Sequence, residues 1–161
     1  MTQEQEEKDY RTVKRILEDL FKDKLVRIEK RPEYSPSDCL YSAQTKDNNI
    51  RAYSLEIKEV KNIDYIFEHG FLLKICKYIK LKQDRDNRNP KEKLYIIYIV
   101  PELGEYYIFD IDRIDLNTVE KVVLNLKVKQ YDPHSPRTEY ACLYIPLTQC
   151  QFKGQYNVEK T

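Results

Sequence analysis

An unbroken apolar run, Leu94-Tyr95-Ile96-Ile97-Tyr98-Ile99-Val100, constrains the fold of this chain more than any other segment. A strand with one solvated face alternates apolar and polar residues, whereas a continuous run is typical of a central strand covered on both faces. A second apolar run over residues 106–111 follows the turn residues 101–104 and predicts a partner strand. Both strands are therefore expected to lie in the core of a sheet with further layers around it.

The segments on either side of this core show helical and strand-like patterns. Residues 5–23 carry apolar side chains at helical spacing with acids early, which predicts an amphipathic helix. Residues 24–30 alternate like a strand, and apolar residues recur over 62–83 as in a helix that is broken or bent at Gly70. Residues 83–93 are wholly polar, which predicts a mobile loop.

The C-terminal part of the chain predicts a peripheral β-hairpin. Residues 122–131 alternate and residues 139–147 form another apolar run, and the polar tail over 154–161 is expected to be frayed. The fold class that follows is α/β, with a mixed central β-sheet flanked by helices and a C-terminal hairpin. The length of 161 residues fits a single domain over residues 1–161.

Composition narrows the function classes. The 28 basic and 27 acidic residues leave a net charge of +1, so nucleic-acid binding must come from local charge asymmetry. Three glycines provide no P-loop or dinucleotide fingerprint, and the four cysteines have no zinc-site spacing and are expected to be reduced core thiols. The start of the chain is acidic and polar, and no apolar stretch approaches the ~18 residues of a membrane span. We therefore expect a cytoplasmic protein without a membrane partner.

Two short strand-like runs hold the residues that suggest chemistry. Residues 38–44 and 50–58 are separated by the polar turn 45–49, which predicts a hairpin. In an antiparallel pair the start of one strand meets the end of the other, so Asp38 is expected beside Glu56. A one-residue slip in register would turn Asp38 to the opposite face.

Alternation along the second run separates its apolar and polar residues. Glu56 and Lys58 point the same way, about 7 Å apart along the strand. The other face carries three apolar residues, Tyr53, Leu55 and Ile57. Two carboxylates and one ammonium group therefore converge at the hairpin end.

Two carboxylates and an ammonium group in one place are suited to phosphodiester cleavage. Two adjacent carboxylates repel when both are ionised, and a hard cation such as Mg²⁺, which prefers oxygen ligands, stabilises them. The metal ion polarises the phosphoryl oxygen and lowers the pKa of a ligand water. Asp38 and Glu56 would be ligands, the carbonyl of Ile57 a third, and Lys58 would orient the water or neutralise the phosphate.

At this point the residues resemble those of the PD-(D/E)XK, or restriction-endonuclease-like, nucleases. The family core runs helix, hairpin with Asp and then Glu-x-Lys, helix, and two further strands, and the pattern over residues 5–115 is similar. Ser37 stands between the proline and Asp38, so the literal Pro-Asp pair is absent. The resemblance implies a nuclease dependent on Mg²⁺ or Mn²⁺ that hydrolyses phosphodiester bonds, in DNA, with Asp38, Glu56 and Lys58 as catalytic residues.

The same tripeptide has a plain alternative interpretation. Glu-x-Lys occurs three times in this chain, beginning at Glu6, Glu56 and Glu59, and only the copy at Glu56 lies on an alternating strand whose partner begins with Asp. On an ordinary outer sheet face, Glu56 and Lys58 would be solvated and form cross-strand ion pairs worth well under ~1 kcal/mol. In the family a first-helix acid sometimes assists the metal. Glu6 and Glu7 lie in that region, and solvation is their alternative role.

A local basic surface is expected on the helix after the hairpin. Its polar side carries four lysines, Lys74, Lys77, Lys80 and Lys82. In RecB-type relatives this helix carries Gln-x-x-x-Tyr, and here Lys74 and Tyr78 have that spacing. We assign nucleic-acid binding to Lys74, Lys77 and Tyr78, to which Arg85 and Arg88 of the polar loop would add. A merely solvated helix face and loop are the alternative.

Two functions remain open at the level of sequence. The first is the metal-dependent nuclease. The second is a catalytically inactive module of the same fold that binds nucleic acid or a protein partner. A domain this small would need a partner protein or a second copy, as in a homodimer, to contact both strands of a duplex. The sequence does not distinguish DNA from RNA, or duplex from branched or single-stranded substrates.

Overall fold

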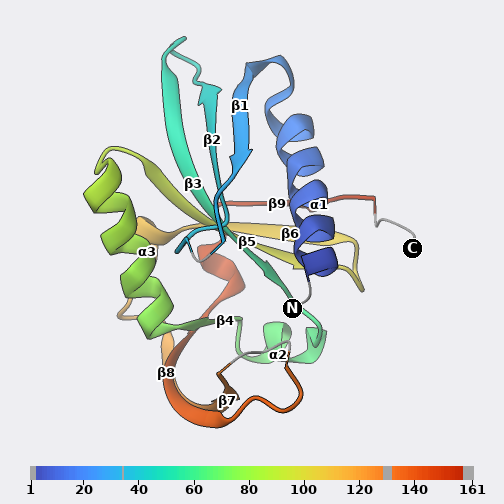
Figure 1. The fold of residues 1–161 in the computed structure, drawn as a ribbon, viewed down its shortest axis with the longest axis vertical. Coiled ribbons are helices and arrows are strands. Elements are labelled where there is room, and N and C mark those ends of the chain that lie inside the picture. Colours follow the sequence, from blue (N-terminus) through green and yellow to red (C-terminus); the bar gives the residue numbers. More distant parts are fainter. Residues whose placement is uncertain (1–2, 34, 129–131, 158–161) are drawn as a thin grey trace.

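The computed structural model describes residues 3–33, 35–128 and 132–157 (Figure 1). The helices are α1 (Gln3–Phe21), α2 (Ile63–Glu68) and α3 (Ile75–Arg88), with short 3-10 turns η1 (Lys22–Lys24), η2 (Ile111–Arg113) and η3 (Leu147–Gln149). The strands are β1 (Leu25–Lys30), β2 (Cys39–Gln44), β3 (Ile50–Glu59), β4 (Phe71–Lys74), β5 (Lys93–Val100), β6 (Glu105–Asp110), β7 (Glu120–Lys127), β8 (Arg137–Ile145) and β9 (Phe152–Gln155).

A six-stranded sheet in the order β1-β2-β3-β5-β6-β9 forms the centre of the structure. Only β3 and β5 run parallel among the paired strands described, and the other neighbours are antiparallel. The helix α1 packs on one face through Val13, Ile16 and Leu17, whereas α3 contributes Leu81 to the core on the other face. The predicted α/β class, with a mixed sheet flanked by helices, is confirmed.

The strand β5 is covered on both faces, as its continuous apolar sequence predicts. Ile97 and Ile99 belong to the core under α1, while Leu94, Ile96 and Tyr98 belong to the core on the α3 side. Burial from both sides removes the need for polar residues at alternate positions, since no face of this strand meets water. The strand also sets the position of β3, which pairs with it in parallel.

The region expected as one broken helix over residues 62–83 is instead helix, strand and helix. The segment Phe71–Lys74 forms β4 and pairs with β8, so its apolar residues fill the core as a strand. Gly70 precedes it with φ +99°, and a Cβ there would lie 2.2 Å from the carbonyl oxygen of Ile145. The chain therefore needs glycine at this turn, and the break that Gly70 predicts is confirmed although the strand after it was missed.

Two other polar segments have more structure than their composition predicts. The expected mobile loop over residues 83–93 is wrong for its first half, because α3 continues to Arg88. The polar tail was expected to fray from Gly154, but Phe152–Gln155 form the edge strand β9 beside β6. Residues 158–161 of that tail lie outside the described residues.

The C-terminal hairpin is confirmed as β7 and β8, paired antiparallel. Residues 129–131 at its tip lie outside the described residues. With β4 the hairpin makes a separate three-stranded sheet in the order β4-β8-β7, which lies below the central sheet in Figure 1.

Within the described ranges, none of the helices combines the length and apolar character needed to cross a lipid bilayer.

Candidate active site

The register of β2 against β3 brings Asp38 to the end of β3. Cys39 pairs with Leu55, and the backbone N–H of Asp38 donates to the carbonyl oxygen of Leu55 at 3.0 Å. The side chain of Asp38 then accepts a hydrogen bond from the backbone N–H of Ile57, with 2.6 Å between N and Oδ2. Asp38 is thus fixed toward the strand that carries Glu56, which is the orientation that the hairpin pattern predicts.

Glu56 lies on the opposite face of β3 from the residues that pack under α1. Tyr53, Leu55 and Ile57 belong to the α1 core, as alternation predicts, while Glu56 is only 2% exposed on the α3 side. Its Oε2 lies 2.8 Å from Nζ of Lys77, and the same Nζ donates to the carbonyl oxygen of Pro36 at 2.5 Å. A buried carboxylate therefore has one ammonium partner, supplied by α3.

The two carboxyl groups crowd one another. The surrounding protein, followed by the neighbouring Glu56 carboxylate, raises the pKa of Asp38 above the ordinary range of an aspartate. Both side chains line the same cavity, and Asp38 is bonded to the backbone N–H of Ile57, the residue after Glu56. Asp38 is nevertheless exposed along one side, so water that enters the site limits this effect. Bringing a cation to Asp38 and Glu56 would relieve the repulsion.

These residues line a cavity of about 610 Å³, which we call the site pocket. Lys58 lines it together with Asp38 and Glu56, and so does Glu6 from α1. Glu7 faces Lys30 instead, with Nζ and Oε1 at 2.5 Å. Of the two first-helix acids considered from sequence, the structure thus brings Glu6 to the pocket.

A second carboxyl group that α1 contributes to this pocket wall was missed by sequence reasoning. Asp9 on α1 is 6% exposed, and Nε2 of Gln5 donates to both Asp9, at 2.9 Å, and Glu59, at 2.6 Å. Burial is the main cause that raises the pKa of Asp9 to about 7, with the Glu59 charge adding to it and the bond from Gln5 opposing it. The signal was present in the sequence, because Asp9 lies four residues before Val13 and so falls on the buried stripe of the helix.

The three residues predicted to bind nucleic acid have different surroundings in the structure. Lys77 points into the site pocket, as its contact with Glu56 shows. Lys74 places its Nζ 4.0 Å from the centre of the Tyr140 ring. Tyr78 is partly buried against the core on the α3 side, which leaves it in a packing role.

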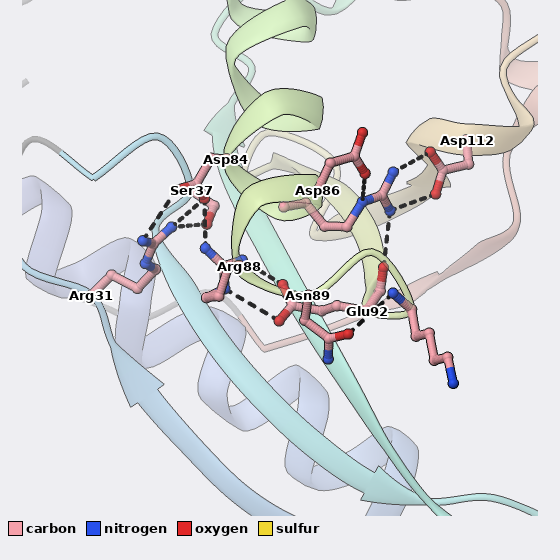
Figure 2. Close-up of polar contacts among 10 residues, drawn as sticks. Arg31, Ser37, Asp84, Asp86, Arg88, Asn89, Glu92 and Asp112 are labelled. Carbon is pink, nitrogen blue, oxygen red and sulfur yellow. Dashed lines mark hydrogen bonds and ion pairs between the residues drawn. The ribbon is translucent and has the colours of Figure 1, made fainter.

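Arg85 and Arg88 do not belong to a loop, which corrects the expectation that they extend a nucleic-acid surface. Arg85 is 5% exposed and forms two hydrogen bonds with the Asp112 carboxylate, at 2.6 and 2.7 Å. Arg88 bonds Asp84 at 2.7 Å and also contacts Glu92 (Figure 2). Their charges are already matched by carboxylates, so we assign them a structural role.

The oxygen ligands present suit a magnesium ion. Among the described residues, no three His, Cys, Asp or Glu side chains gather closely enough to hold a metal by themselves. Mg²⁺ does not require such a group, because it commonly binds through one or two carboxylates and keeps several waters. The Lys77 ammonium on Glu56 shows that a cation is accommodated at this carboxylate. Asp38 and Glu56 therefore fit the ion that the sequence implies, and the carbonyl of Ile57 is the third candidate ligand.

Comparison with known proteins gives a likeness in structure and none in sequence. The sequence matches no protein-family model. It also matches no curated protein. Among solved structures, the chain is similar to Hjc, a Holliday junction resolvase from the archaeal hyperthermophile Archaeoglobus fulgidus, with a TM-score of 0.49 and 12% sequence identity over 84% of this chain and 82% of that one.

Proposed function

We propose that this protein is a Mg²⁺-dependent nuclease that hydrolyses phosphodiester bonds in DNA. The observation that carries the proposal is the meeting of Asp38 and Glu56 at the end of β3, in a pocket that Lys58 also lines. A structural ion-pair network would match each carboxylate with a cation. Here Glu56 is paired with Lys77, but Asp38 has no ion-pair partner among the described residues and lies beside Glu56 at an open cavity, an arrangement that a bound cation would stabilise.

Each residue has a specific role in this proposal. Asp38 and Glu56 would hold Mg²⁺ or Mn²⁺, with the carbonyl of Ile57 as a further ligand. The bound ion supplies Lewis-acid polarisation of the phosphate and a water of lowered pKa. Lys58 would hold the attacking water by hydrogen bonding and neutralise charge on the phosphate oxygens.

Lys77 connects the metal-binding residues to the substrate surface. Its Nζ bonds Glu56 and the carbonyl oxygen of Pro36, and its side chain is 27% exposed. A flexible ammonium group of this kind can exchange a carboxylate partner for a phosphate oxygen at little steric cost. We therefore assign Lys77 to phosphate binding next to the reacting group.

Plasmid cleavage in the presence of Mg²⁺ tests the proposal. We expect wild-type protein to nick or linearise supercoiled DNA, and Asp38→Ala and Lys58→Ala to reduce the rate by at least about 100-fold. A contaminating nuclease would ignore both substitutions, so equal cleavage by all three proteins would overturn the proposal. An RNA oligonucleotide of the same sequence tests the choice of DNA.

The second candidate is a catalytically inactive module that binds nucleic acid or a protein partner. The observation in its favour is the ion pair between Lys77 and Glu56, since a permanently bound ammonium would exclude a metal ion. Thermal unfolding with and without Mg²⁺ separates the two. Metal-induced stabilisation that Glu56→Gln abolishes supports the nuclease, whereas no stabilisation and no cleavage support the binding module.

A further inference from the structure

A second cavity, larger than the site pocket, opens directly beside it. This groove has a volume of about 880 Å³. Ser35, Lys58 and Lys77 line both cavities, so the two spaces adjoin. A ligand that reaches the candidate site can therefore continue into the groove.

The lining of the groove is rich in lysine. Four lysines line it, namely Lys58, Lys74, Lys77 and Lys80, whereas Glu59 is the one acid in the lining within the described part of the chain. Only Lys77 of these four has an ion-pair partner among the described residues. Burial, followed by the charge of Lys58, lowers the pKa of Lys74. An anion in the groove would relieve this repulsion.

Aromatic and aliphatic side chains from the three-stranded sheet and α2 also line the groove. Tyr140 lies under the Lys74 ammonium, and Tyr65 on α2 is 54% exposed. Half-buried Leu124 and Leu126 of β7 complete this apolar part of the lining. Lysines and tyrosines that line one groove match the two parts of an unpaired nucleotide, because phosphates bind lysine and base faces stack on tyrosine.

We propose that this groove binds unpaired nucleotides next to the cleaved bond, so that the preferred substrate is DNA with a single-stranded segment at the cut site. The inference rests on the proposed nuclease function and names its substrate class. The groove volume falls within the range of about 300–1,000 Å³ of small-molecule pockets, which suits a few nucleotides and excludes a double helix. Paired bases are stacked inside a duplex and offer no free face to Tyr65 or Tyr140.

Binding measured in EDTA tests the groove without requiring cleavage. The probes are a short fluorescein-labelled oligothymidylate, a blunt duplex, and the same duplex with a single-stranded overhang, followed by fluorescence anisotropy. We expect wild-type protein to bind the overhang duplex more tightly than the blunt one. Tyr65→Leu and Tyr140→Leu should each weaken oligothymidylate binding by at least about fivefold and change blunt-duplex binding less than twofold.

Phe152→Leu is the matched control. Phe152 has an exposed fraction of 49%, similar to the 54% of Tyr65. It lies on the edge strand β9, three strands away from β3 in the sheet, and does not line the groove. This variant should bind every probe like wild type. Tyr65→Leu is the safer test of the two tyrosine variants, since an exposed ring contributes little to folding, and thermal unfolding checks both proteins.

Different results separate the groove from the nuclease activity. Tyrosine-dependent oligothymidylate binding without any cleavage would uphold the groove and overturn the nuclease. Cleavage with no preference for unpaired DNA would contradict the proposed role of the groove but not the nuclease function. Cleavage by a protein whose DNA binding is unaffected by both tyrosine substitutions would have the same meaning. Equal loss of blunt-duplex and single-strand binding in the tyrosine variants would also contradict the proposed role of the groove.

Discussion

The two ends of α3 carry similar amounts of positive charge and use it differently. At the N-terminal end, Lys74, which caps the helix, and Lys80 line the groove without a carboxylate partner among the described residues, and Lys77 between them pairs with Glu56. At the C-terminal end, Arg85 and Arg88 are bonded to Asp112, Asp84 and Glu92 (Figure 2). Most of the lysines at one end thus have no acidic partner, whereas each arginine at the other end has at least one.

This difference indicates that the lysine end serves binding and that the arginine end stabilises the fold. Arg31 extends the matched group, because it bonds Asp84 at 2.7 Å and Ser37 at 2.8 Å and so ties the loop before β2 to α3. Planar arginine suits such paired carboxylates, whereas lysine exchanges partners readily. The loop that delivers Asp38 is therefore held by the arginine end, and the lysine end stays available for phosphate. The two ends should respond oppositely when their acidic partners are removed.

The largest effect is expected at the lysine end. Glu56→Gln should lower the cleavage rate by at least about 100-fold, because it removes a candidate metal ligand. The free energy of unfolding should change by less than about 1 kcal/mol, since repulsion from Asp38 is relieved while Lys77 can turn toward water. Plasmid cleavage and urea unfolding of the same preparation measure both quantities. Retained cleavage would contradict the assignment of Glu56 as a metal ligand.

The arginine end should show the reverse pattern. Asp112→Asn leaves the Arg85 guanidinium buried with only its contacts to Asp86 and the Glu92 carbonyl. We expect a loss of about 2 kcal/mol in the free energy of unfolding, below the 3–5 kcal/mol of a fully buried pair because Asp112 is 35% exposed. Cleavage per folded molecule should stay within about threefold of wild type. A cleavage defect larger than the stability defect would break the distinction between the two ends.

The pH dependence of stability should also differ between the two sets of carboxyl groups. The pKa of Asp9 is raised to about 7, so the folded protein holds a proton that the unfolded chain loses near pH 4, and this contribution to stability falls as pH rises through about 7. Hydrogen bonds from Arg85 lower the pKa of Asp112, so its contribution is present at neutral pH and lost as pH falls below about 4.

Asp9→Asn tests this contrast. The variant should match wild type near pH 4 and exceed it by about 1 kcal/mol at pH 8, because the amide no longer loses a proton in the buried site. Urea unfolding across this pH range measures the free energy of unfolding. Asp112→Asn is the comparison, because it should lower the free energy of unfolding at pH 8. A variant that is less stable than wild type at pH 8 would contradict the assignment.

The sequence predicts the central features because local pattern determines them. Alternation in β3 separates Glu56 from the residues under α1, and the continuous run of β5 indicates burial on both faces. The strand β4 could not be found in this way, since Phe71–Lys74 pairs with β8, whose residues lie about 70 positions later along the chain. The prediction that Arg85 lies in an exposed loop failed for a related reason. Its partner Asp112 comes from a distant part of the sequence, and this pairing allows a polar residue to be buried in a helix.

The smallest expected effect compares two lysines of the same helix. Lys80 lines the groove, whereas Nζ of Lys82 lies 3.7 Å from the Asp112 carboxylate and belongs to the arginine end. If Lys80 contacts a phosphate, Lys80→Gln should reduce the slope of log binding constant against log salt by about 0.7 for oligothymidylate, which is one released counterion. Lys82→Gln should leave that slope unchanged, since its charge is already matched within the protein. Equal slopes for the two variants would mean that the charge division along α3 does not extend to the bound nucleic acid, because a diffuse positive field would not distinguish lysines two positions apart.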